Sequence, residues 1–227
     1  SSRTPSRTSR GRCQARGVDA FIAISDTVKE RIARFYEKES VVIYPPADAS
    51  YYDIDPHAVR GDFYITVSRL KAYKRIDLII EAFNKLGKEL VVIGSGSEYE
   101  SLRKRAGQTI RFETSLTDEE VLSYYRRARG FVFAGMEDFG LVNVEAQACG
   151  LPVIAYGAGG AAEVVVDGVS GIVYPEQTVE SIVDAVKRFE SLTFDERAVR
   201  ECSLKFDTGQ FKKQFRGFLD KVAREAR

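Results

Sequence analysis

The sequence has few of the residues on which metal sites and nucleophilic triads depend. It contains one histidine, His57, and three widely spaced cysteines, Cys13, Cys149 and Cys202. This content excludes a histidine-based triad, and it gives neither a disulfide framework nor a zinc site. No apolar run approaches the roughly 20 residues needed to span a bilayer, and the segment before Asp19 lacks the apolar core of a signal peptide. These absences point to a globular protein of a reducing compartment.

Basic residues gather at the N-terminal end. Residues 1–17 hold five arginines and no acid, which leaves 29 basic against 33 acidic residues in the remainder, a net charge of −4. A nucleic-acid-binding body would carry a basic footprint, so no nucleic-acid partner is expected. Residues 1–18 are predicted to be a disordered basic segment or one of non-native origin. The alternative is that their arginines touch nucleic acid or anionic lipid.

The rest of the chain divides at a double proline. Pro45-Pro46 forces extended backbone and marks a linker over residues 44–60. Before it, residues 19–43 contain one apolar run and one helical pattern, with Thr27 as the expected helix cap. After it, residues 61–227 read as a complete domain with a long C-terminal helix.

Within this domain, apolar runs alternate with amphipathic stretches. This rhythm is typical of a doubly wound α/β domain with a parallel sheet. The predicted strands cover residues 63–68, 89–93, 110–113, 131–134, 153–156 and 171–174. A phenylalanine stripe on the terminal helix, at positions 211, 215 and 218, is expected to pack inward rather than to form a partner surface.

Ligands of open α/β sheets bind where strands end and helices begin. Arg69 follows the first strand of the domain, and Lys74 begins the next helix. A guanidinium fork and an ammonium group suit a diphosphate, although two solvated loop charges are the alternative. Gly94 and Gly96 follow the second strand, but Tyr99 takes the place of a third glycine, which favours a tight turn over a dinucleotide loop.

Two acids accompany a short helix predicted over residues 139–149, one before it and one within it. Glu137 lies in the preceding turn, and Glu145 lies close to the buried stripe of the helix, where a carboxylate needs partners. The two oxygens of Glu145 match a vicinal diol such as that of ribose; a structural carboxylate bonding backbone is the alternative. Free amides at Phe139, Gly140 and Leu141 would meet a phosphate.

Three further features carry weaker signals. Gly159-Gly160 with Glu163 repeats the pairing of a glycine turn with an acid, and Glu163 serves either the ligand or a helix cap. Asp53 and Asp55 imitate a metal motif, but their place beside Pro56 favours linker acids, so no metal ligand is predicted. Cys149, at a helix C-terminal end, is expected to be a core residue.

The combined motifs resemble those of the retaining glycosyltransferase family four, of the GT-B fold. Glu137 and Glu145 are separated by seven residues within Glu-Asp-Phe-Gly-Leu-Val, Glu-Ala-Gln-Ala-Cys-Gly and Pro-Val-Ile-Ala. They are joined by Ser-Arg-Leu at 68–70 with Lys-Arg-x-Asp at 74–77, by Gly-Gly-x-x-Glu at 159–163 and by Asp-Gly-x-x-Gly at 167–171. The detailed sequence of these motifs is similar to that of prokaryotic mannosyltransferases of O-antigen and polysaccharide assembly. The chain departs from the pattern at Ala134 and Gly135, where a Pro-Ser pair is common.

The resemblance implies a Rossmann-like C-terminal half that binds a nucleotide-sugar donor, with GDP-mannose expected. Arg69 and Lys74 would hold the diphosphate, Glu145 the ribose and Glu137 a sugar hydroxyl. Backbone amides from Phe139 to Val142, including Gly140 and Leu141, would meet the distal phosphate. Glu137, Arg69 and Lys74 are the expected catalytic residues, with no cofactor and no metal.

The resemblance also implies partners beyond this chain. A family member has an N-terminal acceptor-binding domain, of which residues 19–43 resemble only the last strand and helix, so we expect the isolated chain to be incomplete for catalysis. The acceptor would be a polysaccharide or a lipid-linked glycan. The expected location is the cytoplasm, free or peripheral at the inner face of the membrane. Two alternatives stay open, a non-catalytic nucleotide-sugar-binding or assembly module and a GT-B sugar-nucleotide epimerase.

Overall fold

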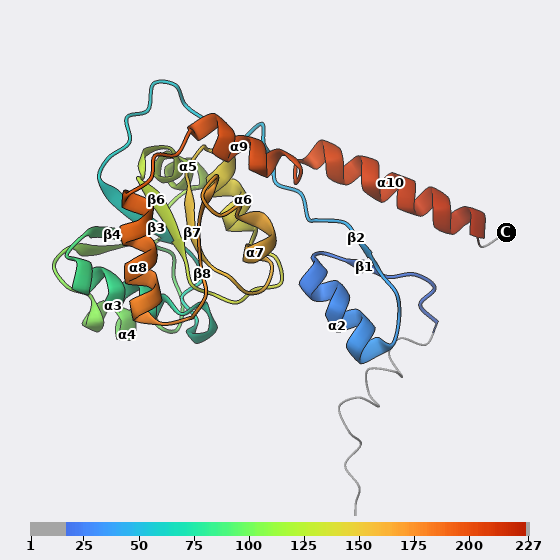
Figure 1. Cartoon of the computed structure of the whole chain (residues 1–227), viewed down its shortest axis with the longest axis horizontal. Coiled ribbons are helices and arrows are strands. Elements are labelled where there is room, and N and C mark those ends of the chain that lie inside the picture. The colour runs from blue at the N-terminus through green and yellow to red at the C-terminus, as the bar shows by residue number, and fades with distance from the viewer. Residues whose placement is uncertain (1–16, 226–227) are drawn as a thin grey trace, which may run out of the picture.

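A computed structural model describes residues 17–225, so residues 1–16 of the predicted basic segment lie outside the described residues (Figure 1). Its centre is a six-stranded parallel sheet with the strand order β5-β4-β3-β6-β7-β8. The predicted doubly wound sheet is therefore confirmed. The strands are β3 (Phe63–Val67), β4 (Glu89–Ile93), β5 (Ile110–Glu113), β6 (Gly130–Phe133), β7 (Val153–Tyr156) and β8 (Gly171–Tyr174).

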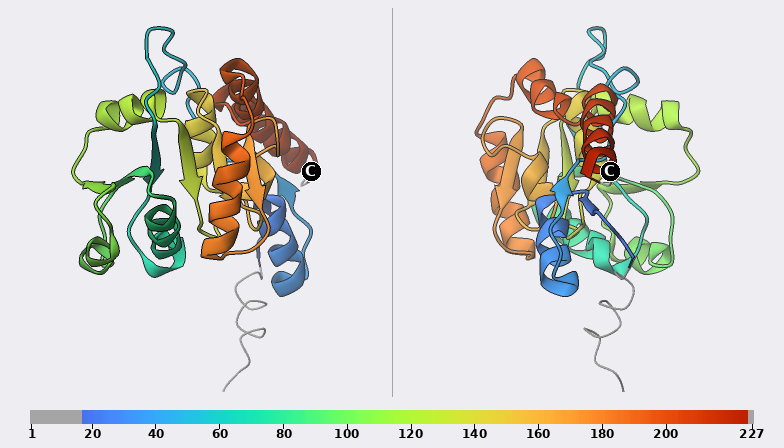
Figure 2. Two further views of the ribbon diagram at one scale, coloured as in Figure 1. Left: turned by 60° about the vertical axis from the view of Figure 1, so that its left-hand side comes forward. Right: turned by 90° about the vertical axis from the view of Figure 1, so that its right-hand side faces the viewer.

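Helices cover both faces of this sheet (Figure 2). One face packs against α3 (Ile76–Leu86), α4 (Tyr99–Arg105) and α8 (Val179–Glu190). The other packs against α5 (Asp118–Arg127), α6 (Leu141–Ala148) and α7 (Ala161–Val164). Because both faces are covered, the strands are apolar at nearly every position rather than alternating.

The strand order sets the position of any ligand. From β3 the chain moves outward to β4 and β5, then returns to pair β6 with β3 and continues outward to β8. The connections thus leave in opposite directions at the β3–β6 pair. This is the switch point at which open α/β sheets form a crevice beyond the carboxyl ends of their strands.

Local sequence signals explain most helix ends. Gly87 ends α3 in the left-handed conformation, and Thr117 with Glu120 forms a capping box at α5. Two predicted starts were wrong. The helix expected from Phe139 begins at Leu141, because Gly140 adopts φ 79° and acts as its N-cap. The first helix is capped by Ser25, whose side chain accepts a hydrogen bond from the Val28 N–H, rather than by Thr27.

A small unit precedes the sheet domain. Strands β1 (Ile22–Ala23) and β2 (Val41–Val42) pair in parallel around helix α2 (Asp26–Tyr36). At the other end of the chain, α9 (Glu196–Leu204), which was not predicted as a separate helix, is followed by α10 (Thr208–Glu225). Helix α10 leaves the sheet domain and passes over the two-stranded unit (Figure 1). None of its described side chains is fully buried, so the phenylalanine stripe is only half-buried, contrary to the expected inward packing.

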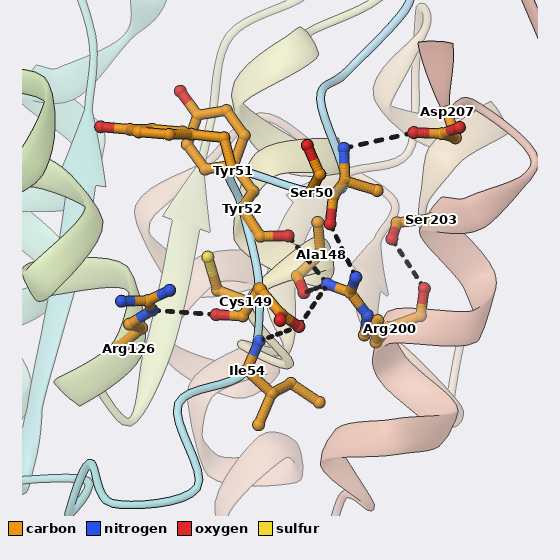
Figure 3. Close-up of polar contacts among 12 residues, drawn as sticks. Ser50, Tyr51, Tyr52, Ile54, Arg126, Ala148, Cys149, Arg200, Ser203 and Asp207 are labelled. Atoms are coloured by element: carbon orange, nitrogen blue, oxygen red, sulfur yellow. Dashed lines mark hydrogen bonds and ion pairs between the residues drawn. The ribbon is translucent and has the colours of Figure 1, made fainter. Parts of the chain in front are cut away.

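Two arginines, Arg200 and Arg60, hold the linker against the C-terminal ends of α5 and α6, and Figure 3 shows the contacts of Arg200. Arg200 donates hydrogen bonds to the carbonyls of Tyr52, Ala49 and Ala148, and it pairs with Asp53. Arg60 donates to the carbonyls of Tyr125, Ala128 and Cys149. Cations at a helix C-terminus also suit the helix dipole. Asp53 is thus engaged as a linker acid, and Cys149 is buried as expected.

Candidate functional site

A cavity of about 800 Å³ opens at the carboxyl ends of β3, β4 and β5. Arg69 and Lys74 both line it, and Val142 lines it from the first turn of α6. Its other side is formed by Glu113, Ser115, Leu116, Asp118 and Val121. The structure therefore places the two predicted cations and the predicted helix tip around one cavity at the switch point.

Lys74, which lines the cavity, forms an ion pair with Glu137, which is not among the lining residues. The two side chains are 14% and 18% exposed, so the pair is largely shielded from water. The backbone at Gly135 lies beside Lys74: a Cβ there would be 3.4 Å from the Lys74 Cα, an ordinary van der Waals contact. Burial, and secondarily the positive charge of Arg69, lower the pKa of Lys74. Two cations that repel each other in a partly dehydrated site form a place for an anion with several negative charges.

Close backbone contacts fix the loop that carries Arg69. A Cβ at Gly94 would lie 2.0 Å from the Ser68 carbonyl oxygen, and one at Gly96 would lie 2.3 Å from that of Leu70. The Leu70 N–H donates to the Ser95 carbonyl at 2.9 Å. The Gly-x-Gly turn is thus a packing element against the Arg69 loop, as the tight-turn interpretation predicted.

A second glycine pair supports the entry to α6. The Gly160 N–H donates to the Glu137 carbonyl at 2.8 Å, and a Cβ at Gly160 would lie 2.2 Å from the Phe139 Cα. The first N–H groups of α6 have no partners within the helix, which leaves them for an anion. The side chain of Phe139 is buried elsewhere, against Tyr44 and Phe206. Phe139 can therefore contribute only its backbone N–H group to the site.

Glu145 lies one turn further along α6 and is held by two tyrosines that the sequence did not reveal. Tyr125 donates a hydrogen bond from its hydroxyl to Glu145 Oε2 at 3.2 Å, and Tyr52 also hydrogen-bonds the carboxylate. Burial raises the pKa of Glu145, and the tyrosine hydrogen bonds only oppose that rise. The predicted alternative of a carboxylate held by backbone does not describe these contacts. A half-buried acid with a raised pKa is typical of a functional position.

Replacing Glu145 with glutamine is expected to stabilise the fold more at pH 7 than at pH 4. The raised pKa means that the folded state holds this proton more tightly than the unfolded chain, so ionisation costs stability as the pH rises through the folded-state pKa. Glutamine removes that cost while its amide oxygen still accepts from Tyr125. Urea unfolding at both pH values measures the difference, with exposed Glu119→Gln as the control. An equal or smaller gain at pH 7 would contradict the assignment.

Glu163 is used for a structural contact rather than for the cavity. Its carboxylate accepts hydrogen bonds from the Asp26 and Thr27 N–H groups at 2.8 and 3.1 Å, and from the Thr27 hydroxyl. It therefore caps α2, a helix 136 residues away in the sequence. Beside it, Arg31 of α2 pairs with Asp138, the residue after Glu137. Of the two roles left open for Glu163, these contacts describe a cap.

Glu163→Ala should therefore loosen α2 and leave the sheet domain intact. Loss of an N-terminal cap typically costs about 1 kcal/mol. Hydrogen exchange should become about fivefold faster at residues 26–29, while exchange in β3 and β6 stays unchanged. Exposed Glu176→Ala serves as the control. Unaltered exchange at the start of α2 would show that this cap contributes nothing.

The chain belongs to the family described as Glycosyl transferases group 1, whose profile matches residues 54–201. Its architecture is that of GT-B glycosyltransferases. A glycosyltransferase from Rickettsia africae superimposes with a TM-score of 0.81 at 18% identity, over 98% of this chain and 69% of that one. Anabaena HepE in complex with UDP-glucose gives 0.80 at 19% identity, over 95% and 68%. At such identities the likeness is one of fold.

Curated relatives include mannosyltransferases. The GDP-mannose-dependent alpha-(1-6)-phosphatidylinositol monomannoside mannosyltransferase of Mycobacterium tuberculosis is 29% identical over 81% of this chain and 55% of its own length. The enzyme of the same name from Mycolicibacterium smegmatis is 32% identical over 74% and 52%. The chain thus spans about half the length of these relatives. Within residues 17–225, none of the helices combines the length and apolarity that crossing a bilayer requires.

Proposed function

We propose that the chain is the donor-binding part of a retaining glycosyltransferase that uses a nucleotide-diphosphate sugar, GDP-mannose in the first place. The observation that carries the proposal is that Arg69 and Lys74 line one cavity and that Glu137 is paired with Lys74 beside it. A diphosphate needs cations, and the sugar attached to it needs a hydrogen-bond acceptor. Arg69 and Lys74 supply the cations, and Glu137, paired with Lys74, supplies the acceptor.

In the proposed reaction, the bond between the anomeric carbon and the diphosphate breaks. Negative charge then grows on the leaving diphosphate, where Arg69, Lys74 and the N–H groups at the tip of α6 stabilise it. Positive charge grows on the sugar ring, near the carboxylate of Glu137. These groups are already in place before the reaction, so no metal ion is required by the proposal. The acceptor hydroxyl attacks from the face of the leaving group, which retains the configuration.

Glu145 would bind the ribose diol. Its carboxylate lies behind the α6 tip, where Tyr52 and Tyr125 fix one edge of it. Its carboxylate form can accept from two vicinal hydroxyls, and the donor would offset part of its desolvation cost. The polar lining at Glu113, Ser115 and Asp118 lies beyond the cations and would meet the base.

The choice of GDP-mannose is supported by the names of the Mycobacterium and Mycolicibacterium relatives. A UDP-sugar is the second candidate, because Anabaena HepE, which shares the fold, is described in complex with UDP-glucose. We extend the proposal to a polysaccharide or lipid-linked glycan as acceptor, bound by a further domain at the inner face of the membrane.

Calorimetric titration with GDP, UDP, GDP-mannose and NAD tests the donor assignment. The expected result is binding of GDP-mannose and GDP with weaker binding of UDP and none of NAD. Arg69→Ala should weaken GDP binding about tenfold, since one charged hydrogen bond contributes roughly 1.5–3 kcal/mol. Glu145→Ala should weaken GDP and UDP alike, because both carry ribose. Binding of NAD alone, or of no nucleotide at all, would refute the proposed function.

A further inference from the structure

Gln177 connects two segments of the site that are far apart in the sequence. Its Nε2 donates a hydrogen bond to the Ala134 carbonyl at 2.7 Å, and its Oε1 accepts one from Arg75 at 3.3 Å. Ala134 directly follows β6 and is itself followed, after Gly135 and Met136, by Glu137. Arg75 directly follows Lys74. The side chain therefore lies between the loop of the acid and the loop of the cation.

Arg75 is itself held in one position. Its guanidinium meets the two carboxylate oxygens of Asp77 at 3.2 and 3.4 Å, and its backbone lies in the left-handed region at φ 54°. A non-glycine residue in this conformation costs about 1 kcal/mol or more, so surrounding contacts have to maintain it. The Asp77 and Gln177 contacts supply such a constraint. Arg75 is thus a rigid point to which Gln177 is attached.

These contacts close a ring. It runs from Lys74 through the peptide bond to Arg75, then through Gln177 to Ala134, along the chain to Glu137, and back to Lys74 through the ion pair. Within the ring, Gly135 is the residue with the greatest backbone freedom. Without the Gln177 hydrogen bond, the segment from 134 to 137 would be fixed at its Glu137 end and hinged at the glycine.

We propose that Gln177 is a positioning residue for donor recognition: it holds the loop of Glu137 at a fixed separation from Lys74. The inference rests on the proposed function of the site. Both ends of this contact require an amide, because the Ala134 carbonyl needs a donor and the Arg75 guanidinium needs an acceptor. Glutamate offers no donor, and leucine offers neither. Neither Gln177 nor Glu137 is among the residues that line the cavity, whereas Lys74 is, so Gln177 acts through the ion pair of Glu137 with Lys74 rather than on the donor.

A purely structural role would make different predictions. A structural contact between β8 and β6 would change overall stability when removed, with equal effects on all ligands. A positioning contact changes the recognition of the sugar more than that of the diphosphate. Free GDP needs Lys74 and Arg69, whereas GDP-mannose also needs Glu137 in its place. The ratio of the two affinities therefore separates the two roles.

The test compares Gln177→Leu and Gln177→Glu with wild type, using Gln108→Leu as the control at an exposed glutamine on the far side of the sheet domain. Two measurements are made on the whole chain. Hydrogen exchange without ligand reports on residues 135–140, and calorimetry gives the dissociation constants of GDP and GDP-mannose. In both Gln177 variants, exchange is expected to rise at least tenfold. The preference for GDP-mannose over GDP should fall about tenfold, with GDP binding changed less than threefold.

Unchanged exchange at residues 135–140 in Gln177→Leu would overturn the inference, whatever the ligand results. So would Gln177→Glu behaving as wild type, because that variant keeps only the Arg75 contact. Glu137→Ala separates the two proposals. If it abolishes the preference for GDP-mannose and Gln177→Leu does not, the positioning role is wrong and the donor site stands. If wild type binds neither ligand, the proposed function itself fails.

Discussion

Lys74→Ala is expected to weaken GDP binding about 100-fold and to reduce sugar transfer by at least as much. Lys74 is a largely shielded cation that lines the cavity beside Arg69. Truncating one member of a buried, hydrogen-bonded charge pair costs roughly 2–5 kcal/mol, and tenfold in affinity corresponds to about 1.4 kcal/mol. Calorimetry with GDP measures the binding effect. Transfer is measured in a full-length relative that carries the equivalent change.

Two controls isolate the contribution of Lys74 to the ligand from its contribution to the fold. Lys71→Ala removes an exposed lysine three residues earlier, whose ammonium meets only Ser97 among the described residues, and it should leave GDP affinity within about twofold. Lys74→Ala/Glu137→Gln removes the acid that the single variant leaves unpaired, so it should recover stability without recovering affinity. If the double variant regained GDP binding, the diphosphate would lie elsewhere.

Gly94→Ala is expected to lower the melting temperature by about 10 °C and to abolish measurable GDP binding. The glycine has φ 135°, and an alanine Cβ would lie 2.0 Å from the Ser68 carbonyl oxygen. Backbone strain of roughly 1–3 kcal/mol adds to an overpacking cost of similar size. In a domain of this size, about 1 kcal/mol shifts the midpoint by roughly 2–4 °C. Because Arg69 follows Ser68, the displaced loop would also carry the guanidinium away from Lys74.

Gly217→Ala is the matched control. This glycine lies in α10, and a Cβ there would have no atom within 4 Å. Alanine should therefore raise helix stability by up to about 1 kcal/mol and leave GDP binding unchanged. Calorimetric melting and GDP titration of both variants give the comparison. If Gly94→Ala melts and binds GDP like wild type, the loops that contain Ser68 and Gly94 can move apart without loss of stability or of GDP affinity.

The sequence predicted the sheet well because each strand is a short apolar run between polar turns. The runs at 110–113, 153–156 and 171–174 match β5, β7 and β8 at both ends. Helix α9 escaped notice because Val199 is its only fully buried apolar side chain among the described residues, which leaves no periodic stripe to detect. The phenylalanines of α10 do form a periodic apolar stripe. Such a stripe predicts the helix, but it does not predict which part of the protein packs against it.

The site was predictable where chemistry follows the strand ends. That Arg69 and Lys74 line one cavity could be predicted because a parallel sheet brings residues at its strand ends to one edge. Tyr52 and Gln177 were not, because their positions depend on tertiary contacts. Arg200 holds the linker backbone at Tyr52, far from Glu145 in the sequence, and Gln177 reaches Ala134 across 43 residues. Neither of these two contacts can be predicted from the spacing of residues along the sequence.

Glu137 and Asp138 are adjacent in the chain, yet they face different parts of the molecule: one meets Lys74, and the other meets Arg31 of α2. A rotation of the peptide unit between them changes both contacts together. Thermodynamic linkage makes such an effect reciprocal. If the proposed donor site is right and such a rotation accompanies binding, an antibody fragment that immobilised α2 would alter nucleotide affinity, and a bound nucleotide would alter the affinity of that fragment by the same factor.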